Sequence, residues 1–243
     1  MPQIIVLDYP GMRTEARIMD LGIDSLECCF VDLLQDSLPE YSGISEYSKQ
    51  LLNKIPENEE TVAILSYCAT LAIAEECLRQ ISSSSRAPAL ITFNQVRSTL
   101  QDVQDAYESA VKKIGDSPRP VLVVDHAESI SSFLLAVRRD LYIRSYEELF
   151  RRDYPLELAK ETSIVSAKMY MNWIELLATS TLPTNVQDVS FESLRIFSSD
   201  FALPDIGHSH ARTAVVNCRK EDLLRADETR TVVTSYLRKS VVH

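Results

Sequence analysis

Glycine is scarce in this sequence, with only five residues among 243. Because glycine has no Cβ, it is the residue that most easily adopts the left-handed conformations of tight turns. An α/β enzyme with many turns between strands and helices usually contains more glycine than this. We therefore expect any active site in this chain to depart from the common patterns of its class.

Paired and clustered cysteines are also missing. The five cysteines are odd in number and contain no C-x-x-C pair; they are Cys28, Cys29, Cys68, Cys77 and Cys218. This number and spacing argue against a disulfide framework and against a zinc site. The sequence therefore predicts reduced thiols and no bound metal.

Positive charge and long apolar runs are in short supply. Lys and Arg number 25 against 35 Asp and Glu, which gives a formal charge of −10 at pH 7. A field of this sign attracts neither nucleic acid nor an anionic membrane, so neither is an expected partner.

No apolar run approaches the ~20 residues that span a bilayer. Residues 1–9 lack the basic start of a secretion signal, and we expect a cytoplasmic protein.

The composition is otherwise that of an ordinary globular protein, with 45% apolar and 25% charged residues. The most informative stretch is residues 61–80, TVAILSYCATLAIAEECLRQ, where the hydrophobic period changes halfway. Residues 61–67 have the length and β-branched composition of a buried strand. From Ala69 onward, apolar and charged residues separate at helical spacing. Cys68 therefore lies on a sharp strand-to-helix corner.

A corner of this kind strains its central residue and needs small neighbours two positions to either side, as in the G-x-S-x-G nucleophile elbow. Here Ser66 and Thr70 take the glycine positions and Cys68 takes that of serine. The N-terminal N–H groups of a helix lower the pKa of a thiol placed there, and Ala69 N–H can serve as an oxyanion donor. The alternative is that Cys68 is a buried apolar residue, as free cysteines often are.

Apolar runs of strand length alternate with helical patterns along the chain. The predicted strands are residues 3–7, 26–34, 61–67, 89–93, 120–125, 194–198 and 214–218, and the predicted helices are 41–55, 69–80, 95–114, 131–152, 156–177 and 221–238. This alternation predicts a doubly wound, mostly parallel sheet with its ligand site at the carboxyl ends of the strands. Asp125 lies at such an end. The turn after residues 3–7 contains Gly11 and Met12, whose N–H groups can complete an oxyanion hole.

Taken in this order, the chain resembles the α/β-hydrolase fold, and within it the thioesterases that act beside nonribosomal peptide and polyketide synthases. The resemblance covers nearly the whole chain, through IIVLDYPGM, SYCAT, PVLVVDHAES, SAKMYMNWIELLATS and LRIFSSDFALPD. It implies one domain over residues 1–243, in which the helical block at about 128–181 is a lid candidate. Cys68 matches the nucleophile. The triad acid of such families follows a strand after the elbow, which Asp125 fits best, with Asp200 as the alternative.

The resemblance breaks at the histidine. Family members carry it between the last strand and the last helix, where this chain has CRKED at residues 218–222. His208 and His210 lie in the loop before the last strand, and either is a candidate because a general base needs only proximity. Alternatively, the thiolate forms without a base. Cysteine needs less help from a base than serine does, so Cys68 and the missing histidine are mutually consistent.

A cysteine nucleophile forms a thioester, close in energy to a phosphopantetheine thioester, which favours passing the acyl group on over hydrolysis. The resemblance therefore implies acyl or aminoacyl transfer, or thioester hydrolysis, on carrier-bound substrates. The implied partner is an acyl or peptidyl carrier protein whose phosphopantetheine arm presents a small acyl or aminoacyl group, and no cofactor of the enzyme's own is implied. The rival hypothesis is a catalytically degenerate fold that binds a carrier or synthase without acyl chemistry.

Docking of an acidic carrier protein on this acidic chain requires local positive charge. Arg138, Arg139 and Arg144 supply cations within the predicted lid. The alternative for these arginines is an ordinary solvated surface, which is what a charge run usually forms.

Overall fold

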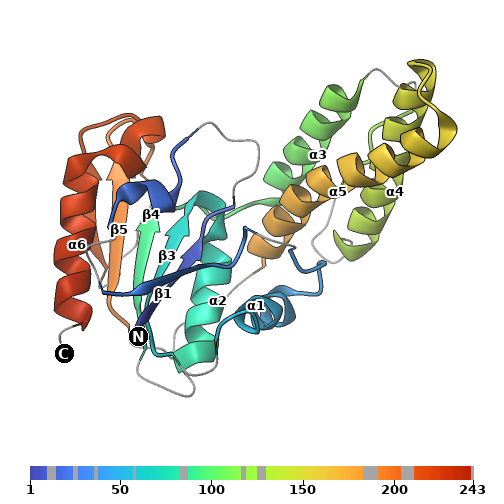
Figure 1. Ribbon diagram of the computed structural model, residues 1–243. Coiled ribbons are helices and arrows are strands. Elements are labelled where there is room, and N and C mark those ends of the chain that lie inside the picture. The colour runs from blue at the N-terminus through green and yellow to red at the C-terminus, as the bar shows by residue number, and fades with distance from the viewer. Residues whose placement is uncertain are drawn as a thin grey trace. The chain divides into compact units, whose positions relative to one another are not determined.

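The computed structural model describes residues 1–9, 15–23, 27–35, 38–56, 59–82, 87–115, 119–124, 130–182, 191–203 and 211–241. These residues form two compact units. The sheet unit comprises Met1–Arg97 and Leu182–His243, and the helical unit comprises Ser98–Thr181. Figure 1 shows the elements of both units. Among the residues described, no helix is long and apolar enough to cross a membrane.

The sheet unit is built on a six-stranded parallel sheet. Its strands are β1 (Gln3–Leu7), β2 (Cys29–Asp32), β3 (Thr61–Tyr67), β4 (Ala89–Phe93), β5 (Ser193–Ser198) and β6 (Arg212–Val216). They lie in the order β2-β1-β3-β4-β5-β6, and every neighbouring pair is parallel. The predicted mostly parallel sheet is confirmed.

Helices cover both faces of this sheet, as Figure 1 shows for α6 on one side and α1 and α2 on the other. The helical elements of the sheet unit are η1 (Ile18–Leu21), α1 (Ile44–Leu52), η2 (Cys68–Thr70), α2 (Leu71–Ser82), η4 (Lys220–Arg225) and α6 (Asp227–Val241), where η marks a 3₁₀ helix. Side chains alternate between the two faces of a strand. Ile4 and Val6 of β1 pack in one core cluster with Leu237 of α6, whereas Ile5 and Leu7 are buried on the opposite face. The predicted doubly wound arrangement is confirmed.

The helical unit consists of α3 (Leu100–Ile114), α4 (Ile130–Arg151) and α5 (Leu156–Ser180). Thr99 caps α3 because its hydroxyl accepts from Asp102 N–H while the Asp102 carboxylate accepts from Thr99 N–H. Tyr107 of α3 meets Phe133 of α4 edge to face, with ring centroids 5.9 Å apart. The helical block therefore includes α3 and begins at Ser98, earlier than the sequence pattern indicates.

The predicted strand at residues 120–125 is wrong. Residues 119–124, which we call the strap, form no strand and belong to the helical unit. Val121 and Val123 are exposed, whereas a central strand would bury both. An apolar run satisfies a strand pattern whether or not a sheet edge is available to it. Asp125 itself lies outside the described residues.

Side chains of α3 and α4 satisfy the backbone of the strap in place of a strand ladder. Gln104 donates through Nε2 to Leu122 O at 2.9 Å and accepts through Oε1 from Val124 N at 3.1 Å. Arg144 donates to Pro120 O at 2.8 Å. These three bonds hold the strap outside the sheet, where its side chains are exposed or half-exposed.

Candidate functional site

The strand order reverses between β1 and β3. β1 leads to β2 on one side of the sheet, and β3 leads to β4 on the other. In open α/β sheets the ligand crevice lies outside the carboxyl ends of the strands at this switch point. Asp8 directly follows β1 and Cys68 directly follows β3, so both lie at the switch point.

Cys68 has the strained backbone of a nucleophile elbow. Its φ is 53°, and only Asn94 and Asp153 share a positive φ among the described residues other than glycine. Left-handed backbone costs an L-residue free energy and persists where the surrounding structure imposes it, often at active sites. Cys68 follows β3 and starts η2, which continues into α2, and Cys68 is half-buried. The predicted strand-to-helix corner is confirmed, while its chemistry stays a prediction.

Two hydroxyls replace the glycines that such a corner usually carries. The Oγ of Ser66 and the Oγ1 of Thr70 lie 2.8 Å apart in a hydrogen bond. Thr70 Oγ1 also shares its one proton between Leu7 O at 2.9 Å and Tyr67 O at 3.0 Å. Because that proton points to the carbonyls, Ser66 is the donor in the bond between the two hydroxyls. Both side chains are buried, so the bonds hold the corner closed and tie it to the end of β1.

The proposed oxyanion donors are placed only in part. Ala69 is the residue after Cys68, in the first turn of η2, and it is buried. N–H groups in the first turn of a helix have no partner within the helix, which leaves them available to a ligand. Gly11 and Met12 lie outside the described residues. Their role therefore stays a prediction.

Asn94 is a site residue that the sequence reasoning missed. It follows β4, has a φ of 42° and is 2% exposed. Its Oδ1 accepts from Ser198 N at 2.9 Å, which joins the ends of β4 and β5. Two residues later, Val96 N donates to Cys68 O at 3.3 Å. An asparagine directly after an apolar strand was the available signal, because asparagine tolerates left-handed backbone better than most residues.

Of the two carboxylates considered for the acid, only Asp200 follows a strand in the part of the chain that the structure describes. It comes two residues after β5, and its carboxylate accepts from the Ser198 side chain and the Lys220 backbone N–H. These hydrogen bonds hold the pKa of Asp200 below its usual range. The predicted strand before Asp125 does not form, and Asp125 itself lies outside the described residues, so the choice of acid stays a prediction.

The segment that follows β6 and includes Cys218 lies beside Asp200. Ser199 N and Ser199 Oγ both donate to Cys218 O, at 3.2 and 3.1 Å. Burial raises the pKa of the Cys218 thiol, and the nearby Asp222, Asp200 and Glu228 carboxylates raise it further. Asp200 and residues 218–222, the segment in which the resemblance predicts a histidine, are thus neighbours, and this segment contains no histidine.

His208 and His210 lie outside the described residues, as does His126. No three His, Cys, Asp or Glu residues within the described ranges are grouped so as to hold a metal ion.

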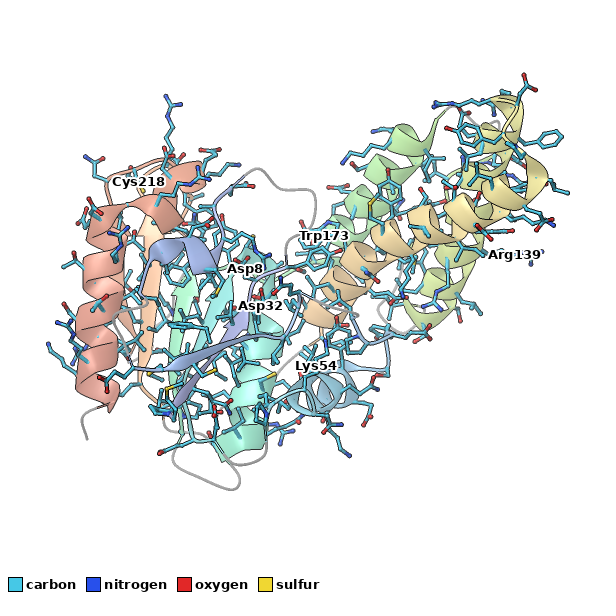
Figure 2. All side chains as sticks on the ribbon, viewed as in Figure 1. Asp8, Asp32, Lys54, Arg139, Trp173 and Cys218 are labelled. Carbon is cyan, nitrogen blue, oxygen red and sulfur yellow. The ribbon has the colours of Figure 1, made fainter. Side chains whose placement is uncertain are left out.

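The three arginines predicted for docking differ in environment. Arg144 is 2% exposed and donates to Asp140 Oδ2 and to the backbone oxygens of Arg119 and Pro120. A guanidinium held in this way is not available to a partner, so the assignment of Arg144 to docking is wrong. Arg138 is partly exposed and pairs with Glu175 at 2.6 Å. Arg139 is exposed (Figure 2) and stays a docking candidate.

Comparisons with known proteins agree with this architecture. No protein-family model and no curated protein matches the sequence. Solved structures do match. The thioesterase domain of Vlm2, bound with a dodecadepsipeptide, has a TM-score of 0.51 at 12% identity over 98% of this chain and 92% of its own. MGS-M2, an α/β hydrolase from a deep-sea metagenome library, has a TM-score of 0.51 at 14% identity over 100% and 90%.

A lipase-esterase related protein from Clostridium acetobutylicum has a TM-score of 0.52 at 12% identity over 98% of this chain and 93% of its own. Likeness at these identities establishes the fold. The chain has the α/β-hydrolase fold, as the sequence predicts.

Proposed function

We propose that this protein transfers or hydrolyses thioester-linked acyl groups through a covalent thioester on Cys68. The observation that carries the proposal is the left-handed backbone of Cys68, with φ of 53°, at the strand-to-helix corner of the switch point. Strain of this kind presents a side chain at the top of a sheet, which is what the nucleophile elbow of this fold does. The buried hydroxyls of Ser66 and Thr70 support the proposal, because they maintain the corner without glycine.

In the proposed reaction, the Cys68 thiolate attacks the carbonyl carbon of an acyl thioester. The new C–S bond produces a tetrahedral intermediate whose oxygen carries the negative charge, and Ala69 N–H is the oxyanion donor. Collapse of the intermediate breaks the bond to the donor thiol, which leaves as a thiolate, and the acyl group remains on Cys68. Attack by a second thiol completes transfer, and attack by water completes hydrolysis.

Transfer is the favoured outcome for a cysteine at this position. The acyl-cysteine thioester lies close in free energy to the donor thioester, so the acyl group is not trapped. Water attack on a thioester depends strongly on a general base, whereas a thiol that is already partly ionised depends on it less. We assign His208 or His210 as the candidate base for hydrolysis. Asp200 is the carboxylate that we assign to orient this base.

The proposed donor is an acyl or peptidyl carrier protein with a phosphopantetheine arm. The thioesterase domain of Vlm2, which has the same fold, binds a dodecadepsipeptide. An exposed arginine suits an acidic partner, and Arg139 is our candidate on α4, because its side chain forms no hydrogen bond or ion pair with the described residues. Arg139→Glu should slow transfer from a carrier more than transfer from an acyl N-acetylcysteamine thioester. Arg238→Glu, on the exposed face of α6, is the matched control.

Intact-mass measurement after incubation with an acylated carrier protein tests the proposal. The parent protein should gain the mass of one acyl group, and Cys68→Ala should gain none. Cys29→Ala is the matched control, because Cys29 is a half-buried thiol in β2 and should not affect the mass gain. A mass gain that survives Cys68→Ala would remove Cys68 from the mechanism.

A second function is favoured by the residues beside Asp200. The segment in which the resemblance predicts the histidine has CRKED at residues 218–222, and the Asp200 carboxylate is bonded to the backbone of Lys220. A fold of this class that has lost its base can still bind a carrier protein. Stable binding of the acylated carrier with no mass gain on the parent would favour this binding function over the enzyme.

A further inference from the structure

One buried hydrogen-bond donor next to the elbow has no acceptor among the described residues. It is Nδ2 of Asn94, a residue that is only 2% exposed. The other end of the amide fixes the identity of this atom. Ser198 N–H can only donate, so the atom that it meets at 2.9 Å is Oδ1 of Asn94. Buried donors without a partner are rare because they cost free energy, so Asn94 carries a donor that the fold itself does not use.

Asn94 and Cys68 are adjacent at the carboxyl edge of the sheet. Tyr67 of β3 and Phe93 of β4 are register partners in parallel strands, which run side by side in Figure 1. Cys68 and Asn94 directly follow these partners, and neighbouring strands lie about 4.8 Å apart. A direct contact agrees with this placement, because Val96 N donates to Cys68 O at 3.3 Å. The unused donor and the thiol therefore belong to neighbouring residues.

The two residues also share a strained backbone. Their φ values are 53° for Cys68 and 42° for Asn94, and among the described residues other than glycine only Asp153 also has a positive φ. Strain of this kind persists where the surrounding structure imposes it, often at active sites. Two strained residues at neighbouring strand ends indicate one site.

The charged groups at the same edge of the sheet are already paired. Arg17 Nη2 donates to Asp32 Oδ2 at 2.6 Å, and Arg17 Nε lies 3.7 Å from Asp8 Oδ2. Hydrogen bonds hold the pKa of Asp200 below its usual range, so its carboxylate is negative near pH 7. Burial raises the pKa of Tyr9, so this phenol is neutral there. These groups give an anion at the strand ends no unpaired positive charge, and the thiolate must be stabilised by hydrogen-bond donors.

We propose that Asn94 Nδ2 stabilises the thiolate of Cys68. A neutral thiol is a weak acceptor, so the bond forms when the thiol loses its proton to water. A donor to the charged form favours ionisation, and it acts more strongly in a buried site of low dielectric constant. The inference rests on the proposed function, because it explains how the attacking thiolate forms although residues 218–222 contain no histidine. Asn94 is then a catalytic residue, since it contacts the reacting sulfur.

The pH dependence of Cys68 alkylation tests this role. Iodoacetamide forms a C–S bond to the thiolate and releases iodide, so the rate rises with pH and levels off once the thiol is ionised. The midpoint of the profile reports the stability of the thiolate, whereas the limiting rate at high pH reports access to the sulfur. Peptide mapping assigns the label to Cys68, and circular dichroism identifies the pH range in which each variant is folded.

Asn94→Gly removes the amide and keeps the left-handed backbone, which glycine adopts without strain. The midpoint should move to higher pH, because the thiolate loses a donor. Alkylation at pH 7 should slow about tenfold, which corresponds to the loss of one hydrogen bond to a charged group. The limiting rate at high pH should stay within about twofold of the parent.

Asn94→Asp separates the two ends of the amide. It keeps an oxygen that accepts from Ser198 N–H and replaces the unused donor with a charged oxygen. The midpoint should move further than in Asn94→Gly, and alkylation at pH 7 should slow about 30- to 100-fold. An unmoved midpoint in this variant overturns the inference whether or not Asn94→Gly folds.

Thr92→Val is the matched control on the same strand. It removes a buried hydroxyl that donates to Gln95 Oε1 at 2.6 Å, two residues before Asn94. The variant should be less stable in chemical denaturation, but the midpoint of Cys68 alkylation should stay at the parent value.

Two further outcomes overturn the inference. An unchanged midpoint in Asn94→Gly would show that the amide does not reach the thiolate. Equal losses at pH 7 and in the high-pH limit would show that Asn94 supports access to Cys68 or the fold. Intact-mass measurement with an acyl thioester tests the proposed function separately. A shifted midpoint without an acyl mass gain on the parent would refute the proposed function but not the stabilisation of the thiolate. A mass gain with an unmoved midpoint would do the reverse.

Discussion

Buried polar side chains occur in both units, but the groups to which they bond differ between the units. In the sheet unit they lie where strands end: Ser66 and Thr70 hold the corner at Cys68, and Asp8, directly after β1, accepts from Ile18 N–H. In the helical unit, Gln104 and Arg144 bond to the backbone of the strap, which is part of no strand.

This difference distinguishes polar residues that support the candidate site at Cys68 from polar residues that only stabilise the fold. In the sheet unit, the hydroxyls of Ser66 and Thr70 hold the corner at Cys68, a residue with the strained backbone that is typical of functional sites. The polar side chains of the helical unit bond to the backbone of the strap and hold this extended segment in place. Substitutions in the sheet unit should therefore change reactivity at Cys68, and substitutions in the helical unit should change stability.

The largest expected effect is in the reactivity of the thiols. Burial raises the pKa of Cys77 to about 12, and Cys77 is fully buried in α2. Its thiolate fraction near neutral pH is about 10³-fold below that of an ordinary thiol. Brief iodoacetamide treatment followed by peptide mapping should label Cys68 first. Cys28 and Cys218, whose pKa values are raised by burial and nearby carboxylates, should follow slowly. Labelling of Cys68 no faster than Cys218 would favour the interpretation of Cys68 as a buried apolar residue.

The second effect concerns stability of the helical unit. Arg144→Met removes the guanidinium that bonds Asp140 and two strap carbonyls, and leaves a partly buried carboxylate with one fewer donor. Removal of one partner of a buried pair typically costs about 3–5 kcal/mol in the free energy of unfolding. Chemical denaturation should show this loss. Arg139→Met, on the exposed side of α4, should change stability by less than about 0.5 kcal/mol.

The rate of Cys68 alkylation in the Arg144→Met variant also tests the comparison between the two units. Under conditions where Arg144→Met is still folded, its Cys68 should react at the parent rate, because the lost bonds lie within the helical unit. A large change in the alkylation rate of Cys68 would show that polar residues of the helical unit affect the reactivity of Cys68 as well as stability.

A smaller effect is expected at the elbow. Thr70→Val keeps the shape of the side chain but removes the hydroxyl that donates to Leu7 O and bonds Ser66. Loss of a buried hydrogen bond costs about 1–3 kcal/mol of stability. Because the corner also orients Cys68, acylation should slow about tenfold beyond any loss of folded protein. Thr70→Ser should recover most of the rate. Equal acylation by Thr70→Val and the parent would show that the corner holds without this hydroxyl.

The smallest effect is a pH dependence at Asp200. Hydrogen bonds from Ser198 and from the Lys220 backbone lower the folded-state pKa of Asp200 below the value in the unfolded chain. The contribution to stability is therefore present above the ordinary aspartate pKa, about 3.9, and is lost as the pH falls through the lower folded-state value. Asp200→Asn should be slightly less stable than the parent at pH 7, and the two should converge in acid. A difference that is constant across this range would contradict the prediction.

The sequence by itself determined the elements whose signal is local. The strands at Gln3–Leu7 and Thr61–Tyr67 begin and end where the apolar runs do. The corner at Cys68 follows from a change of hydrophobic period within a few residues, and the parallel sheet follows from strands alternating with helices.

The tertiary structure alone decided which distant residues meet. The strap has the composition of a strand, but its partners are side chains on α3 and α4, and no local pattern encodes that choice. Arg144 is one of several arginines on α4, and only the packing of the helical unit buries it. Arg17 bonds to carboxylates on two different strand ends. Side-chain bonds between residues far apart in the chain depend on the assembled fold, because they form only once the backbone has brought the partners within reach.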